Sequence, residues 1–114
     1  MRRYTKPTNT IDLRESGRLI LAHGEVTGHC HEVVTEGALS IPAAQFFEEP
    51  TGRRVLLVTA PCILRHDEHA PIALDPMCPQ QYRQGDVLLM PLGPGAWHVI
   101  RQKESADIAR QVAD

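Results

Sequence analysis

Proline and glycine interrupt this chain so often that few stretches are long enough for a helix. The 114 residues contain nine prolines and eight glycines. Proline removes a backbone donor and clashes with the preceding helical turn, and glycine lowers helix stability. Between these breaks lie short runs rich in valine, isoleucine and leucine, which are typical of β-strands. The pattern therefore predicts an all-β protein, a sandwich or barrel of short strands.

Several segments carry this strand pattern. They are 18–34 (two strands divided near Gly24), 37–41, 53–60, 62–66, 86–92 and 96–102. Residues 1–16 are expected to form an extended or partly ordered arm, and residues 104–114 either one or two helical turns or an extended tail. A chain of this length builds one core, so we expect a single domain over residues 1–114.

Composition argues against several classes of partner. The formal net charge is only -2 and the arginines are scattered, which is unlike the basic surface of a nucleic-acid-binding protein. No segment has the length of a membrane span, and no apolar core of a secretion signal follows the N-terminal arginines, so we expect a cytoplasmic location. Three cysteines without paired spacing predict neither a disulfide framework nor a structural zinc site.

The strongest functional signal is the segment His29-Cys30-His31. Residues two apart on a strand share a face, so the two imidazoles project together and Cys30 points away. Two donors about 6 to 7 Å apart at the backbone can bind one metal ion. Glu36 follows His31 after five residues and can return a carboxylate to the same ion past a turn. A chance pair of histidines on a solvent-facing strand needs no metal, and this alternative stays open.

Two later segments supply further imidazoles. His66 and His69 are three apart, so both reach one site only if the chain turns, and the spacing favours one of them. His98 follows Trp97 and lies on the opposite face of a strand. Either His98 faces inward as a ligand, or Trp97 takes the core and His98 is exposed. The donor set suits a divalent transition metal: zinc, iron, manganese, nickel or copper.

Parts of the chain resemble the two motifs of the cupin superfamily. The first motif is matched by Gly24, His29, His31 and Glu36, and the second by Gly85, Pro91, Gly95 and His98. The first motif here is one residue shorter before His29, and the second has two extra residues before Gly95 and Gln102 in place of an asparagine. The resemblance implies a jelly roll, or double-stranded β-helix, whose three histidines and glutamate hold one divalent metal.

The chain also resembles a narrower group of small, uncharacterised bacterial and phage cupin-like proteins. The shared segments are "GEVTGHCH", "HDEHAPI" and "RQKE". This likeness implies that His66 or His69, rather than His98, provides the third imidazole. It implies no particular reaction.

Three functions remain open from the sequence. A metal with three protein ligands keeps positions open for water or substrate, as in a small-molecule metalloenzyme. A metal-dependent binding or sensing module would use the same site without turnover, and a structural protein would use no metal. Titratable groups that can act as a general base near the site are Glu25, His23, Asp67 and Glu68, but none is assigned a catalytic role.

The apolar strands are also expected to enclose a ligand pocket. Valine and leucine side chains, with Trp97 or the Phe46-Phe47 pair, would suit a small organic molecule. A jelly roll of this size leaves sheet edges that need protection, so we expect a homodimer.

Overall fold

A computed structural model describes residues 2–24, 28–35 and 43–101, and every regular element in these ranges is a β-strand. The strands are β1 (Ile11–Asp12), β2 (Leu19–His23), β3 (Cys30–Val34), β4 (Ala44–Glu48), β5 (Arg54–Val58), β6 (Cys62–Arg65), β7 (Ile72–Leu74), β8 (Tyr82–Gln84), β9 (Val87–Gly93) and β10 (Ala96–Arg101). In these ranges no helix is long and apolar enough to cross a lipid bilayer. The three cysteines are free thiols.

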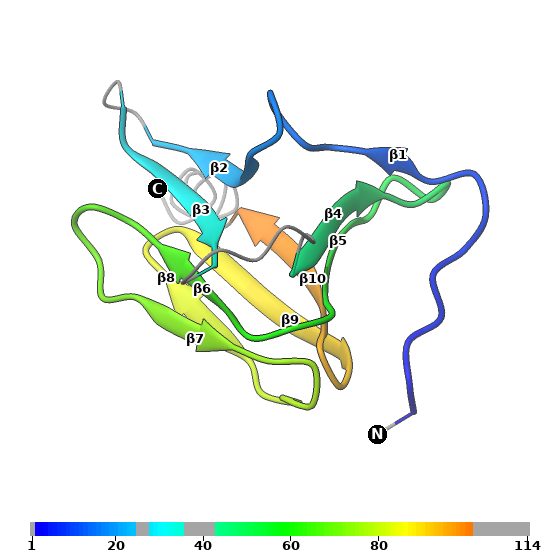
Figure 1. Ribbon diagram of the computed structural model, residues 1–114. Coiled ribbons are helices and arrows are strands. Elements are labelled where there is room, and N and C mark those ends of the chain that lie inside the picture. Colours follow the sequence, from blue (N-terminus) through cyan, green and yellow to red (C-terminus); the bar gives the residue numbers. More distant parts are fainter. Residues whose placement is uncertain (1, 25–27, 36–42, 102–114) are drawn as a thin grey trace, which may run out of the picture.

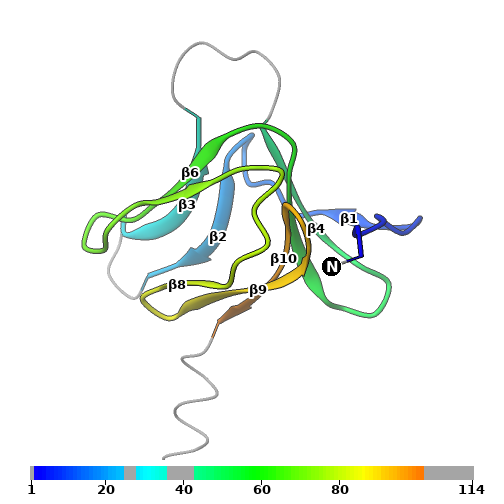
Figure 2. The same cartoon turned by 90° about the horizontal axis from the view of Figure 1, so that it is seen from below.

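The strands form two antiparallel sheets that face each other (Figures 1 and 2). One sheet has six strands in the order β1-β4-β5-β10-β9-β8, and the other has four in the order β2-β3-β6-β7. The prediction of an all-β protein is therefore confirmed, and the two sheets are compatible with a β-sandwich. The β4–β5 hairpin belongs to the six-stranded sheet, whereas β3 and β6 on either side of it pair in the other sheet.

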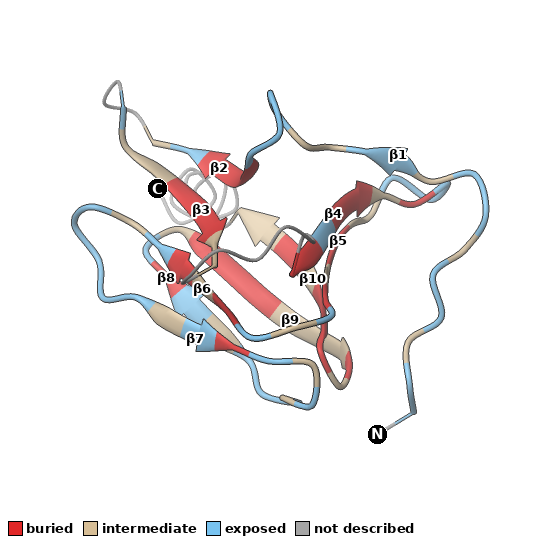
Figure 3. Cartoon of the chain, in the orientation of Figure 1, coloured by how far each residue is buried: buried red, intermediate tan, exposed pale blue. Residues whose placement is uncertain are grey.

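The core fills the space between the two sheets (Figure 3). Trp97 on β10 is completely buried there, and its indole Nε1 donates a hydrogen bond to the carbonyl oxygen of Gln80 at 2.6 Å. Leu56 and Leu64 are buried as fully from the two facing sheets. Because neighbouring residues on a strand alternate, Trp97 takes the inner face of β10 and His98 the outer face. Of the two alternatives left open by the sequence, the structure has the one with Trp97 in the core.

Most of the predicted strands are present with shorter bounds. Segment 18–34 contains β2 and β3, and the segments from residue 53 onwards contain β5, β6, β9 and β10. The predicted strand at 37–41 and the C-terminal tail at 104–114 lie outside the described residues. The sequence pattern missed β1, β4, β7 and β8. Three of these are only two or three residues long, and β4 lies between two prolines.

The N-terminal arm lies against the outer face of the six-stranded sheet. The Tyr4 ring packs beside Phe47 with their centroids 6.5 Å apart, and the ammonium of Lys6 lies 4.7 Å from the centre of the Phe47 ring. The Tyr4 hydroxyl donates to Glu49 Oε2 at 2.6 Å. Further along the arm, β1 pairs with β4 and becomes the edge of the sheet.

The buried carboxylate that anchors this arm gives the structure a testable acid sensitivity. Hydrogen bonds from Arg53, aided by those from Tyr4 and Thr51, hold the pKa of Glu49 below its usual range despite its burial. Glu49→Gln is therefore expected to lower the free energy of unfolding at neutral pH by about 1.5 to 3 kcal/mol, the range for hydrogen bonds to charged groups.

The pH dependence of this effect has a definite sign. Because folding depresses the pKa of Glu49, its contribution is present above the unfolded pKa of about 4.3 and is lost as the pH falls through the folded value. Urea unfolding at a series of pH values should show the gap between wild type and Glu49→Gln closing towards acid. Glu48→Gln is the matched control, because it removes a charge one residue earlier and leaves the bonds of Glu49 to Arg53 and Tyr4 in place. A gap independent of pH would contradict the assignment.

Candidate metal centre

Four histidines on or beside two paired strands, β3 and β6, gather at one end of the four-stranded sheet. His31 lies on β3, and the register that places Glu32 opposite Arg65 brings His66, just after β6, opposite His31. The chain then bends over residues 67–69 and returns His69 to the same place. The turn that the sequence required for both histidines is therefore present, and the structure brings both of them to His31.

Three of these rings form a compact triangle. The ring centroids are 4.4 Å apart for His31 and His66, 4.6 Å for His66 and His69, and 6.0 Å for His31 and His69. Imidazoles bound to one tetrahedral ion, with metal–nitrogen distances near 2.1 Å, have centroids about 5 Å apart. The triangle thus has the dimensions of a three-histidine metal site. His29 lies at its edge, 6.1 Å from His66.

Hydrogen bonds determine which nitrogen of His31 carries a proton. The Gln84 amide nitrogen donates to the carbonyl oxygens of Leu64 at 2.9 Å and Ala70 at 3.0 Å, which directs Oε1 towards His31. His31 Nδ1 lies 2.8 Å from this oxygen and so must be the donor. His31 and Gln84 are each 2% exposed. In the neutral ring the lone pair is consequently on Nε2, the arrangement that second-shell partners impose on metal-binding histidines.

The Nε2 atom of His31 faces a carboxylate. Asp86 Oδ1 lies 3.1 Å from it, and the other carboxylate oxygen, Oδ2, accepts a hydrogen bond from Arg101 Nε at 2.9 Å. Burial would raise the pKa of Asp86, but the hydrogen bond and charge of Arg101, together with His31, hold it below its usual range. Two acceptors cannot bond to each other, so the gap between Nε2 and Oδ1 needs a proton or another cation.

The turn between β8 and β9 lies against the rings of the site. Gly85, between Gln84 and Asp86, has φ of +58°, a conformation that favours glycine. A Cβ atom added there would lie 2.6 Å from His69 Nε2 and 3.3 Å from His31 Cε1. The side chain of any other residue would thus collide with the His69 ring, and glycine lets both rings approach this turn closely.

The other two rings of the triangle, His66 and His69, have contrasting surroundings. Burial, then repulsion from His31 and His69, lowers the pKa of His66, so its ring is neutral at pH 7. Its Nδ1 accepts a hydrogen bond from the Glu68 amide at 3.0 Å. His69 is exposed, which leaves one side of the cluster open to solvent.

His29 carries a buried nitrogen without a hydrogen bond. Among the described residues, its Nδ1 has no hydrogen-bond partner, although Glu68 Oε1 lies 3.2 Å away and Asp67 Oδ2 3.9 Å away. A buried polar atom left without a partner costs free energy and needs an explanation. Here a cation on Nδ1, either a proton or a metal ion, would satisfy it opposite two carboxylates.

The described residues contain no complete set of metal ligands. No group of three or more histidine, cysteine, aspartate or glutamate side chains there is already arranged to hold a metal ion. Two contacts explain this: the His31 Nε2 faces Asp86 and the His66 Nδ1 accepts the Glu68 amide. A metal would have to take the place of these contacts.

The remaining candidates from the sequence lie elsewhere. Glu36 and Glu25 fall outside the described residues. His98 projects from the outer face of β10, where burial and the charge of Arg53 lower its pKa. His23 pairs with Glu15 at 2.9 Å. The structure therefore brings together His29, His31, His66 and His69, and places His98 apart from them.

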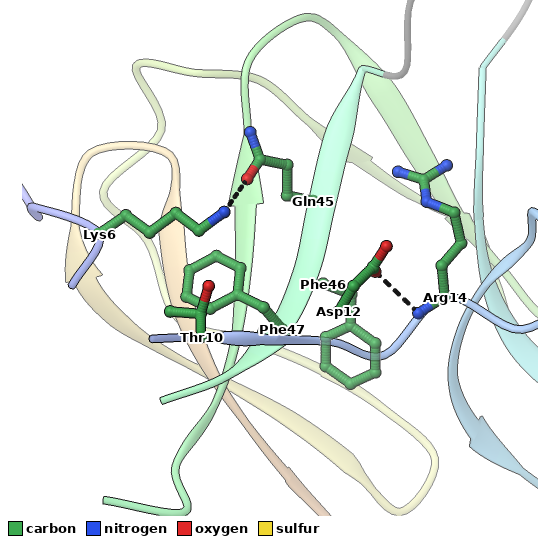
Figure 4. A pocket seen from close by; sticks show the side chains of 7 residues that line it. All are labelled: Lys6, Thr10, Asp12, Arg14, Gln45, Phe46 and Phe47. Carbon is green, nitrogen blue, oxygen red and sulfur yellow. Dashed lines mark hydrogen bonds between the residues drawn. The ribbon is translucent and has the colours of Figure 1, made fainter. Parts of the chain in front are cut away.

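Among the described residues, two cavities lie away from the four clustered histidines. One, of about 250 Å³, opens beside β1 and β4 under the N-terminal arm, where Lys6 reaches Gln45 across the Phe47 ring (Figure 4). The other, of about 380 Å³, lies between β2 and the six-stranded sheet and has Arg101 in its wall. The Phe46-Phe47 pair lines the first and Phe46 also lines the second, whereas Trp97 is in the core and lines neither.

A family model described as a domain of unknown function (DUF8820) matches residues 2–76. The chain belongs to this family. No curated protein and no solved structure gives a significant match. The DUF8820 match includes all four clustered histidines, while Gln84, Asp86 and Arg101 follow its last residue.

Sequence reasoning missed the second half of this site. The sequence pattern gives Gly85 only a place in a cupin-like motif whose histidine is His98, and gives Asp86 only the first position of a predicted strand. A polar residue at each side of a turn glycine is a common pattern and gives no signal of a ligand. Only the pairing of β8 with β9, and the approach of their turn to β3, reveals the contact with His31.

Proposed function

We propose that this protein is a small cupin-like metal-binding protein in which His31, His66 and His69 hold one divalent transition metal. The observation that carries the proposal is the triangle of rings with sides of 4.4, 4.6 and 6.0 Å. It is supported by Gln84, which leaves the His31 lone pair on Nε2, and by Gly85, whose lack of a side chain lets the His69 and His31 rings approach the same turn. Three imidazoles beside carboxylates are a donor set that suits zinc, iron, manganese, nickel or copper.

A jelly roll of the cupin type is the finer description of the fold that we propose. Its support is the way in which the β4–β5 hairpin crosses to the second sheet between β3 and β6, which nevertheless pair. Greek-key and jelly-roll proteins share such connections. Because β3 and β6 pair in spite of this crossing, the histidine segments at the ends of these two strands lie side by side.

When bound, a metal held by three imidazoles supplies a Lewis acid or an activated water to a small molecule at its open positions. The exposed side of the cluster at His69 provides access from solvent. The protein's own residues set the site: Gln84 orients His31, and Glu68 and Asp67 add negative charge beside His29. The same site would serve an enzyme or a binding module, and we assign no catalytic residue.

Metal content measured on untagged protein tests the proposal. Protein stripped with a chelator and titrated with Co²⁺ is expected to bind about one equivalent, because the donor set forms a single site. The triple variant His31→Ala/His66→Ala/His69→Ala should bind less than about a tenth of an equivalent. Elemental analysis after gel filtration gives the stoichiometry, and circular dichroism verifies that the variant is folded.

His98→Ala is the matched control, because it removes one imidazole from the outer face of β10. It should bind Co²⁺ like the wild type. Loss of binding in this control would instead favour the ligand set of the second cupin-like motif. If the wild type binds no Co²⁺, Zn²⁺ or Ni²⁺, the metal-binding function fails, and the histidine cluster is a hydrogen-bonded structural network around His31 and Asp86.

A further inference from the structure

We infer that Asp86 is a fourth ligand of this centre and supplies its carboxylate. The inference rests on the proposed metal-binding function and assigns a residue that neither of the cupin-like motifs predicts for the metal. Its basis is the position of Asp86 Oδ1, 3.1 Å from His31 Nε2, the ring nitrogen that does not bond to Gln84.

The separation of these two atoms matches two donors on one ion. Donor atoms about 2.0 to 2.1 Å from a shared metal lie about 3.3 Å apart at a tetrahedral angle and about 2.9 Å apart at a right angle. The observed 3.1 Å falls between these values. An ion can therefore take the place of the proton between Nε2 and Oδ1 with little movement of either residue.

Arg101 fixes which oxygen of Asp86 faces the histidines. Its Nε donates to Oδ2 at 2.9 Å, and its terminal nitrogen donates to the carbonyl oxygen of His23 at 2.6 Å. The guanidinium is thus anchored at a second point and holds the carboxylate in one orientation. Oδ1 remains the oxygen directed at the cluster, which predicts a monodentate ligand with an outer-shell arginine.

Asp86 is better placed than the other acids near the cluster. The side chains of Asp67 and Glu68 are 65% and 64% exposed, and both face His29 at the edge of the ring triangle. The Asp86 side chain is 29% exposed and faces His31, a member of the triangle. Gly85, the residue before Asp86, lets the His69 and His31 rings approach the backbone of this turn closely. The same turn therefore provides the carboxylate and lies against two of the three rings.

The visible absorption of bound Co²⁺ distinguishes a residue that binds the metal from one that only lies near it. The visible bands of Co²⁺ depend on the atoms bound to it, so Asp86→Asn should shift these bands as well as weaken binding. The loss of affinity should be at least the approximately 10- to 100-fold that outer-shell substitutions cost. Asp67→Asn is the matched control, because it removes a carboxylate from the same neighbourhood without altering the triangle. It should change affinity by about 3-fold or less, the effect of one exposed, solvent-screened charge, and leave the bands in place.

The spectrum decides the outcome. If Asp86→Asn binds Co²⁺ with unchanged bands, Asp86 is not a ligand, and the inference fails whatever the affinity, while the three-histidine site stands. If the wild type binds no metal, the proposed function itself fails. Should Asp86→Asn not fold, Asp86→Glu keeps the charge and displaces the carboxylate by one methylene. Shifted bands in Asp86→Glu then support the inference, and unchanged bands and affinity overturn it.

Discussion

Replacing Gln84 by leucine is expected to weaken Co²⁺ binding about 10- to 100-fold and to lower the free energy of unfolding of the metal-free protein by about 2 to 4 kcal/mol. Gln84 is 2% exposed and makes three hydrogen bonds, to His31 Nδ1 and to the carbonyl oxygens of Leu64 and Ala70. Leucine has a similar volume but makes none of them. The buried Nδ1 of His31 then loses the acceptor that fixes its proton.

Two measurements separate the effects of this substitution. Urea unfolding of the metal-free protein gives the stability, and a Co²⁺ titration of the folded variant gives the affinity. Gln81→Leu is the control, since Gln81 is exposed three residues earlier and should change the free energy of unfolding by less than about 0.5 kcal/mol. Wild-type affinity in Gln84→Leu would show that His31 needs no orienting partner, and would remove the main support for its Nε2 lone pair.

The first half of the site could be predicted because its signals are local. The spacing of two predicts that His29 and His31 project together, and in the structure both rings lie near His66, although β3 begins only at Cys30. The Ala-Pro pair after His69 favours a turn, and the bend over residues 67–69 is what lets both later histidines meet His31. In each case a few consecutive residues carry the information.

The second half could not be predicted because it depends on contacts between distant residues. His31 and Gln84 are 53 residues apart, and His31 and Asp86 are 55 apart. Their meeting depends on β8, a strand of three residues in a proline-rich segment that has almost no strand signal of its own. The sequence shows which residues have suitable chemistry, but the pairing of strands decides which of them share a site.

The orientation of Trp97 and His98 was likewise only partly predictable from the sequence. Strand alternation requires them to face opposite ways, but it does not say which faces inward. In the structure the larger and more apolar side chain fills the core, and the carbonyl oxygen of Gln80 satisfies its one polar atom. Burying His98 instead would have placed an imidazole among leucines and valines. The energetics of packing thus settled what periodicity left open.

Trp97→Ala should therefore produce the largest loss of stability among single substitutions on β10. The side chain is fully buried between the sheets, so its removal leaves a large cavity and is expected to cost about 3 to 5 kcal/mol. Urea unfolding followed by far-ultraviolet circular dichroism measures this loss without relying on tryptophan fluorescence. For a domain that keeps only about 5 to 15 kcal/mol of stability, such a loss can leave a large unfolded fraction.

His98→Ala, on the opposite face of the same strand, is the matched comparison and should cost less than about 1 kcal/mol. Trp97→Phe keeps most of the apolar volume but removes the donor to Gln80, so it should fall between the two. If His98→Ala were the more damaging change, β10 would have the opposite face in the core. The alternation of side chains along β10 now places His98 on the outer face. It would then place His98 on the inner face, towards the histidine cluster, and the assignment of ligands would change.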